Sequence, residues 1–182
     1  MTTTTARVQA RIDTIRIVWE TDEAPDLSWI GEFKNSITAA EESHAVHHRA
    51  RGGDAREFEW FVSGNAYEDV SPRTRKKYVE QDYQRLLAYG ETWHSVGCYA
   101  EARVSYPTQP AGTWRTETLR SGGLWGIESD SDKTYRAEVA QDELADLKDH
   151  LDQFNVDTSN FDALAKTAEW VWVADPESQG AS

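Results

Sequence analysis

The most constraining feature of the chain is the alternation of apolar and polar side chains between residues 92 and 106. Successive side chains in a strand point to opposite faces of a sheet, so this pattern predicts a long strand with one buried face. The apolar face comprises Val96, Cys98, Ala100, Ala102, Val104 and Tyr106. The opposite face carries Ser95, Glu101, Arg103 and Ser105. A strand of this length needs neighbouring strands and a covering layer, so the fold must be built around a sheet.

The segment that follows contains two further strand-like stretches separated by turn residues. The segment Pro107–Gly112 predicts a turn, and Trp114–Leu119 predicts the returning strand. Gly122-Gly123 predicts a second turn before a short strand over Leu124–Ile127. Three consecutive strands of this kind are typical of an antiparallel meander.

Two more strands are expected nearer the N-terminus. The apolar residues of Ala6–Glu20 change parity near Asp13–Thr14, which predicts a strand with a β-bulge at that point. Phe58–Ser63 is a second candidate strand. Residues 21–34 contain Pro25 and two aromatic side chains, and we expect a loop there.

Helices are predicted in four segments. A weak helix over 36–51 has capping-box spacing from Thr38 to Glu41. A second helix spans Ser71–Gly90, and the clearest pattern places a third over Ser131–Phe154. A short helix begins near Ser159 and continues through Ala168 and Val171. The predicted fold class is therefore α+β, with an antiparallel β-sheet covered by about three or four α-helices.

The chain of 182 residues has the length of one domain, and we predict a single domain over residues 1–182 with disordered ends at 1–5 and 175–182. Cys98 is the only cysteine, so an intrachain disulfide is excluded. The N-terminal residues lack the apolar stretch of a signal peptide. These features predict a cytoplasmic protein.

Charge argues against direct binding to nucleic acids. The chain has 32 acidic and 19 basic residues, a net charge of −13, and it therefore repels phosphate backbones and anionic membranes. A local basic patch remains compatible with that total. A strongly negative field attracts basic partners and accelerates their encounter.

The acidic residues are concentrated on the predicted third helix. Ten acids and three bases lie between Asp130 and Asp162. At about 100° per residue, several of these acids fall on one side, opposite the apolar face, and i,i+4 neighbours lie about 6 Å apart along the axis. That spacing is of the same order as successive phosphates on a nucleic-acid strand. The predicted partner-binding residues are Glu138, Asp142, Asp146, Asp149 and Asp152.

Two explanations of this acidic face remain open. Most charged helix faces are simply solvated. However, like charges at i,i+4 destabilise a helix by a few tenths of a kcal/mol per pair. Selection for stability alone would therefore tend to mix the signs, and this one-sided pattern favours a binding role.

A histidine cluster offers a different kind of function. In a helix over 36–51, Glu41, His44 and His48 would share a face, with His47 beside them, and such a set can hold zinc or iron. A metalloprotease helix needs Glu directly after its first His, where this chain has Ala45. Solvent-exposed histidines are the simpler interpretation. The alternative function is a small metal-dependent enzyme using His44, His47 and His48.

Tryptophan is abundant, with eight residues. Most are expected in the core, but some of Trp29, Trp60 and Trp172 lie in weakly patterned segments and are candidates for exposure. Exposed aromatics beside acids are typical anchors of protein interfaces. They also permit a third function, as an oligomeric structural or assembly subunit.

The segment from Ser121 to Asp132 reads SGGLWGIESDSD and precedes a helix rich in Glu, Asp and Leu. Over about Tyr99 to Leu151, the chain resembles uncharacterised small proteins of bacterial phages and plasmids. The resemblance implies no fold, activity or site residue. It does imply an accessory role such as countering host defence, whose enzymes often carry basic nucleic-acid channels.

Together these observations predict a non-catalytic acidic interaction protein from a mobile genetic element, with no cofactor and no bound metal. The predicted partner is a basic nucleic-acid-binding host protein, such as a CRISPR or restriction complex. The chain would inhibit it through an anionic surface that mimics DNA.

Overall fold

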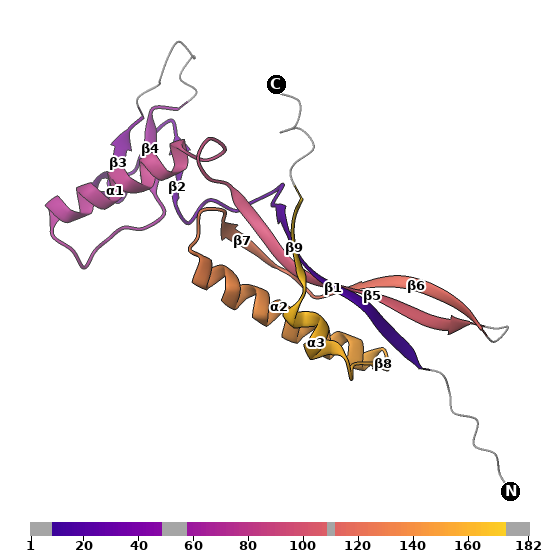
Figure 1. Ribbon diagram of the computed structural model, residues 1–182. Coiled ribbons are helices and arrows are strands. Elements are labelled where there is room, and N and C mark those ends of the chain that lie inside the picture. The colour runs from indigo at the N-terminus through magenta and orange to yellow at the C-terminus, as the bar shows by residue number, and fades with distance from the viewer. Residues whose placement is uncertain (1–8, 49–57, 109–111, 174–182) are drawn as a thin grey trace, which may run out of the picture. The chain divides into compact units, whose positions relative to one another are not determined.

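A computed structural model describes residues 9–48, 58–108 and 112–173 (Figure 1). The described chain divides into two compact units. Among the described residues, unit 1 comprises 9–23, 95–108 and 112–173, and unit 2 comprises 24–48 and 58–94. Each unit is treated by itself below. The single domain over 1–182 stays a prediction, and the predicted disordered ends at 1–5 and 175–182 lie outside the described residues.

Unit 1 is built on the strand that the alternating pattern predicted. Strand β5 (Ser95–Thr108) pairs antiparallel with β1 (Ala10–Thr21) along one edge. Its other edge pairs first with β6 (Thr113–Arg120) and then with β7 (Leu124–Glu128), both antiparallel. The free edge of β1 pairs with two further strands, both parallel to it: β8 (Val156–Asp157) and β9 (Glu169–Val173).

The predicted antiparallel meander covered by three or four helices is wrong. Strands hold 39% of the structure against 30% in helices, and the sheet is mixed, because β8 and β9 run parallel to β1. Both follow helices, and a strand that follows a helical crossover runs parallel to the strand before the helix. The strand before α2 is β7, which is antiparallel to β5 and therefore has the direction of β1. In addition, β7 does not pair with β6 but continues along the same edge of β5. Gly122-Gly123 thus separates two strands that lie on the same edge of β5, and it does not form the predicted reverse turn.

The bulge in the first strand is confirmed. The register between β1 and β5 shifts between Ile12 and Thr14, around Asp13. The extra residue keeps Ile12 and Ile15 on the same, buried side of the sheet, although they are three positions apart.

Two helices accompany this sheet. Helix α2 (Lys133–Gln153) is capped by Asp132, whose side chain accepts hydrogen bonds from the backbone of Thr134 and Tyr135. Helix α3 (Phe161–Lys166) is short, and the predicted continuation through Ala168 and Val171 is wrong. Residues 170–173 are aromatic and β-branched, and they fit the edge of a sheet better than a helix.

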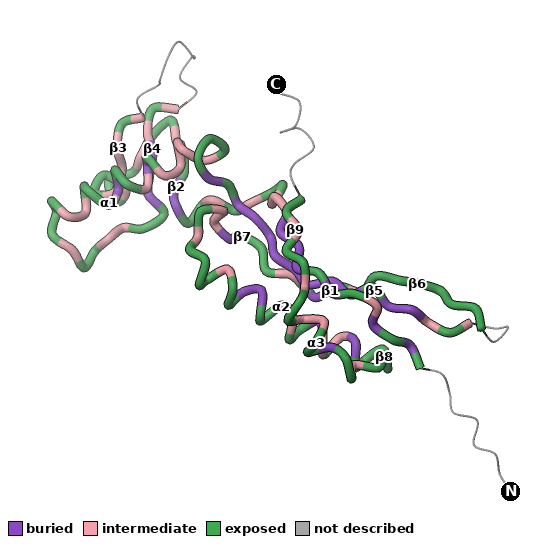
Figure 2. Tube along the Cα trace, viewed as in Figure 1, coloured by how far each residue is buried: buried purple, intermediate pink, exposed green. Residues whose placement is uncertain are grey.

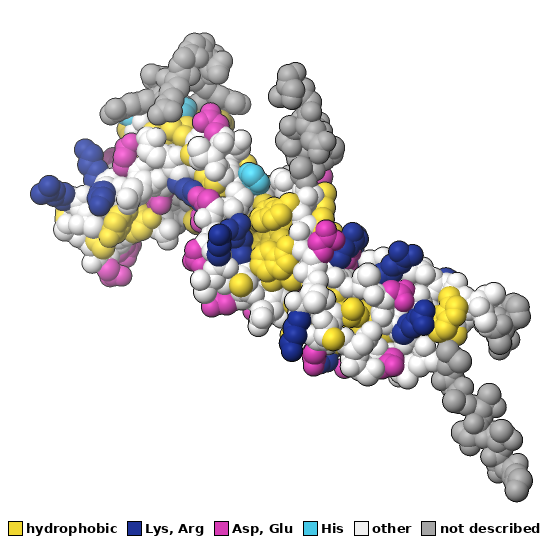
Figure 3. Space-filling view, viewed as in Figure 1, with side chains coloured by type: hydrophobic (Ala, Val, Ile, Leu, Met, Phe, Trp, Pro, Cys, Tyr) yellow, Lys and Arg dark blue, Asp and Glu magenta, His cyan; other side chains and the backbone are white. Residues whose placement is uncertain are grey.

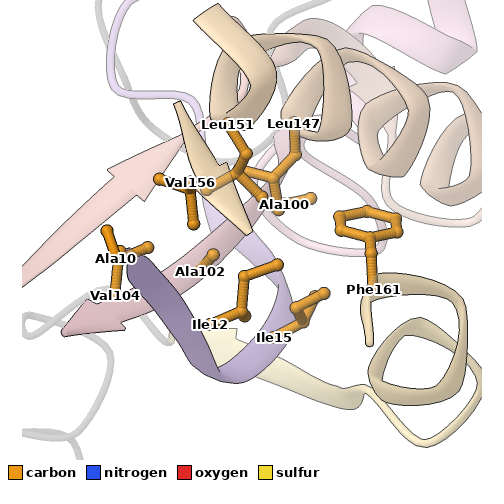
Figure 4. Close-up of a cluster of buried hydrophobic side chains, with 10 residues drawn as sticks. All are labelled: Ala10, Ile12, Ile15, Ala100, Ala102, Val104, Leu147, Leu151, Val156 and Phe161. Atoms are coloured by element: carbon orange, nitrogen blue, oxygen red, sulfur yellow. The ribbon is translucent and has the colours of Figure 1, made fainter. Parts of the chain in front are cut away.

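The core lies between α2 and one face of the sheet (Figure 2). The N-terminal half of α2 contributes Val139 and Ala140, which pack with Trp19 and Cys98. The C-terminal half contributes Leu147 and Leu151 to the cluster that Figure 4 shows. That cluster comprises Ala10, Ile12, Ile15, Ala100, Ala102, Val104, Leu147, Leu151, Val156 and Phe161.

Unit 2 is a small sheet with one helix. Its strands are β2 (Gly31–Lys34), β4 (Trp60–Ser63) and β3 (Ala45–His47), in that spatial order and antiparallel. Helix α1 (Pro72–Leu87) is confirmed, with Ser71 as its N-cap. Its core is formed by Phe61, Val79 and Tyr83. In the described part of the chain, no helix has both the length and the apolar character needed to cross a membrane.

Two predictions fail in unit 2. The segment 21–34 is not only a loop, because it ends in β2. The helix over 36–51 is absent from its described part, where a single 3₁₀ turn, η1 (Glu42–His44), leads into β3. The capping-box contact itself does form, since Glu41 accepts a hydrogen bond from the Thr38 backbone at 2.8 Å. Without an apolar stripe, however, pairing with β4 determines the conformation.

Glu41 is held in its ionised form by these contacts. Its carboxylate accepts a hydrogen bond from Lys34 Nζ at 2.8 Å and others from Thr38. They lower the pKa of Glu41 from 4.5 to about 2. Ionised Glu41 therefore stabilises the fold above pH 4.5, and this contribution is lost as the pH falls towards 2.

We predict that Glu41→Gln lowers the free energy of unfolding at pH 7, because Gln cannot pair with the Lys34 ammonium. The difference from wild type should shrink as the pH falls from 4.5. Urea unfolding at a series of pH values measures it. A difference that stays constant between pH 7 and pH 3 contradicts the assigned role of Glu41.

Candidate functional site

The predicted acidic face lies on the outer side of α2. All five of its carboxylates are on exposed residues: Glu138, Asp142, Asp146, Asp149 and Asp152. At 100° per residue they fall within about a third of the helix circumference, opposite buried residues such as Leu147. Within the described chain, Glu138, Asp142 and Asp149 make no side-chain hydrogen bond or ion pair. These three carboxylates are therefore available to a partner.

Other side chains of α2 form hydrogen bonds with residues 120–123, the segment between β6 and β7. Glu143, which is buried, accepts hydrogen bonds from Ser121 Oγ at 2.6 Å and from the Gly123 backbone N–H at 3.0 Å. Asp146 accepts one from the Gly122 backbone N–H at 2.7 Å. His150 Nδ1 donates to the Arg120 carbonyl at 3.0 Å. These side chains of α2 therefore hold the segment between β6 and β7 in place. Asp146 is exposed and also makes one of these hydrogen bonds.

The acidic residues of α2 thus fall into two groups, one exposed to solvent and one bonded to the chain between β6 and β7. Residue type alone does not distinguish the two groups. Asp142 and Glu143 are adjacent in sequence, yet one is exposed and the other buried. The Ser121 hydroxyl links Glu143 to the sheet, because it also accepts a hydrogen bond from the Ala100 backbone at 2.9 Å. The SGG segment is therefore explained by packing rather than by a functional motif.

We predict opposite outcomes for two neighbouring substitutions. Glu143→Ala leaves the Ser121 hydroxyl and the Gly123 N–H without acceptors and should cost about 2–3 kcal/mol. Asp142→Ala removes an exposed, repelled carboxylate and should change stability by less than about 0.5 kcal/mol. Urea unfolding of both variants checks this. Equal destabilisation would show that the two acids do not differ in role.

Several aromatic side chains are exposed, as expected for an interface. Tyr135, 42% exposed, lies on the acidic side of α2, one turn before Glu138 and two turns before Asp142. On β9, Trp170 and Trp172 are 44% and 49% exposed, and Figure 3 shows a hydrophobic patch beside this strand. They stack against buried Trp19, with ring centroids 6.1 and 5.4 Å apart.

The expectation that most tryptophans lie in the core is wrong, because five of the eight are exposed: Trp29, Trp114, Trp125, Trp170 and Trp172. Trp29 and Trp172 are exposed, as expected. Trp60 is only partly exposed, and its ring packs on that of His47 with centroids 4.1 Å apart.

The histidines do not form the predicted cluster. Without a helix, Glu41, His44 and His48 no longer share a face. His48 Nδ1 lies 3.1 Å from the Tyr83 hydroxyl, and His47 packs on Trp60. In the described residues, no group of three or more His, Cys, Asp or Glu side chains is placed to hold a metal. The geometry therefore gives the metal-dependent alternative no support.

Cys98, which the alternating pattern placed on the apolar face of its strand, is a structural thiol. It is completely buried in the core of unit 1. Burial, together with the nearby Glu143 carboxylate, raises the pKa of the Cys98 thiol from 9.0 to about 12. A thiol with so little thiolate at neutral pH is a poor nucleophile.

We predict that Cys98 does not react with Ellman's reagent at pH 8 in the folded protein. Addition of urea should expose one reactive thiol per chain, because unfolding removes the burial that raises its pKa. The release of thionitrobenzoate measures both states. Rapid reaction of the native protein would contradict the buried position of Cys98.

The open face of the sheet carries a polar arrangement that sequence analysis missed. Glu101, 4% exposed, forms ion pairs with Arg16 and with Arg120, the latter at 3.1 Å between Oε2 and Nε. The Arg120 guanidinium also lies over the Tyr99 ring, 4.8 Å from its centroid. The alternating pattern had placed Glu101 on the polar face. It did not reveal that arginines from β1 and β6 meet there.

Comparisons with protein-family models, with curated proteins and with solved structures each found no match. The resemblance to phage and plasmid proteins over about Tyr99–Leu151 stays a prediction.

Proposed function

We propose that this protein is a non-catalytic binding protein that engages a basic partner through the acidic face of α2. The observation that carries the proposal is the exposure of all five predicted carboxylates along one side of a single helix. Three of them have no partner among the described residues. A helix presents these charges in a fixed order, so the backbone that carries them needs no ordering on binding.

The spacing of the acids favours a partner that normally binds nucleic acid. Glu138, Asp142 and Asp146 follow one another at intervals of four residues, about 6 Å along the helix axis. A groove with cations arranged for successive phosphates fits such a row. Tyr135, at the end of the row, offers an aromatic anchor of the kind enriched in interfaces.

The proposed activity is inhibition by occupancy, because the acidic face would fill the channel that the partner uses for DNA or RNA. The resemblance to proteins of phages and plasmids points to defence complexes, such as CRISPR or restriction enzymes, as the class of partner. The net charge of −13 supports fast encounter with a basic channel.

The proposal is tested by charge reversal with a matched control. The test variant is Glu138→Lys/Asp142→Lys/Asp149→Lys, which leaves the structural Asp146 in place. The control variant, Glu42→Lys/Glu68→Lys/Asp69→Lys, makes the same change in net charge at three exposed acids of unit 2. Tagged proteins are used to capture partners from a bacterial lysate at low and high salt, with identification by mass spectrometry.

We expect wild type and the control variant to capture a nucleic-acid-processing complex at low salt, and DNA or RNA to compete it off. The test variant should bind that complex at least about tenfold more weakly, since three attractive charges become repulsive. Equal capture by the test variant, or loss of capture in the control variant alone, overturns the proposal.

A further inference from the structure

A pocket of about 580 Å³ lies on the sheet of unit 1. Four cross-strand pairs bring its polar residues together: Thr14 with Arg103, Arg16 with Glu101, Arg103 with Thr118, and Arg16 with Glu169. Cross-strand partners share a face of a sheet. Since Ala100 and Ala102 point to the core under α2, these polar residues lie on the opposite face. Ile15, Leu164 and Thr167 complete the lining at the edge of β1. The pocket is therefore separate from the acidic face.

Two arginines give the pocket its strongest donors. Arg16 is anchored by its ion pair with Glu101, whose side chain is only 5% exposed, while half of the Arg16 side chain remains accessible. Arg103 is exposed and, in the described part of the chain, makes no ion pair or side-chain hydrogen bond. A guanidinium carries five N–H donors in a planar fork that matches carboxylates and phosphates. Both forks therefore retain donors for an anionic group.

Glu101 is a buried carboxylate that orders the arginines around it. A buried carboxylate is costly unless it is paired. Here it pairs with Arg16 on one side and with Arg120 on the other. The pairing fixes the Arg16 guanidinium before any ligand arrives, so that less entropy is lost on binding. Glu101 is thus a positioning residue beneath the pocket.

The remaining polar groups select for hydroxyls. Glu169 lines the pocket. A carboxylate accepts hydrogen bonds from hydroxyl donors and disfavours a ligand that is anionic throughout. Thr14 and Thr118 add hydroxyls that both donate and accept. The volume falls within the range of about 300–1,000 Å³ typical of small-molecule sites.

We propose that this pocket binds a small polyhydroxylated organic anion, such as a sugar phosphate or a sugar acid. Arg16 and Arg103 hold the phosphate or carboxylate, and Glu169 and the threonines hold the hydroxyls. The proposal goes beyond the proposed partner binding and does not depend on it, because the two sites lie on opposite sides of the sheet–helix layer.

The test is titration calorimetry of the full chain with glucose 6-phosphate, gluconate and inorganic phosphate, together with NMR shifts of residues 101–103 and 167–169. We expect glucose 6-phosphate or gluconate to bind one-to-one with a dissociation constant of about 1 mM or below. Whichever of these two ligands binds more tightly shows whether the pocket prefers a phosphate or a carboxylate. Inorganic phosphate should bind more weakly than the sugar phosphate. Equal affinity overturns the assignment of Glu169 and the threonines.

Three variants make the test specific. Arg103→Gln should weaken binding at least about tenfold, because it removes charge-assisted hydrogen bonds. Glu169→Gln should weaken the binding of glucose 6-phosphate but not the binding of inorganic phosphate. The control Arg115→Gln loses the same charge on β6, outside the pocket, where Arg115 pairs with Glu117. Far-UV circular dichroism confirms folding. Equal losses in Arg103→Gln and Arg115→Gln, or no binding at about 10 mM ligand, overturns the proposal.

Discussion

The sheet of unit 1 depends on the hydrogen bonds that α2 makes to the chain between β6 and β7. Both strands pair with β5, and the segment between them leaves backbone groups without partners in the ladder. Glu143 and Asp146 supply acceptors for the Gly123 and Gly122 N–H groups, and His150 supplies a donor for a carbonyl. Gly122 and Arg120 are exposed and Gly123 is half-buried, so among these bonds the one from Gly123 to buried Glu143 is the least replaceable by water. The helix thus completes the edge of the sheet as well as covering its face.

This structural requirement divides the acids of α2 into two groups. Helical spacing placed five acids on one side of the helix, and all five are exposed, while their role in binding stays a prediction. The sequence offered no means of recognising Glu143 as different from Asp142. The distinction arises from the position of the Ser121–Gly123 segment, which is 20 residues and more away along the chain. Composition therefore overestimates the number of carboxylates available for binding.

Predictions from local patterns succeeded where the segment carries its own periodicity. The strand β5, the bulge in β1 and the helix α2 are confirmed because alternation, parity change and capping are local signals. Predictions failed where pairing with a distant strand decides the conformation. β3 and β9 replace predicted helices because β4 and β1 offer them open edges. The pocket was missed for the same reason, since Arg16, Glu101 and Glu169 meet only through the register.

Net charge is a poor guide to what one surface can bind. The chain carries −13, which predicted repulsion of anions. Charges beyond about 8 Å are largely screened at physiological ionic strength, so a site responds to its near neighbours. Beside the pocket, Arg16 and Arg120 neutralise Glu101, and Arg103 has no ion pair among the described residues, although Glu169 also lines the pocket. The same chain can therefore offer carboxylates to a basic protein from α2 and guanidinium groups to a small anion from the opposite side of the sheet.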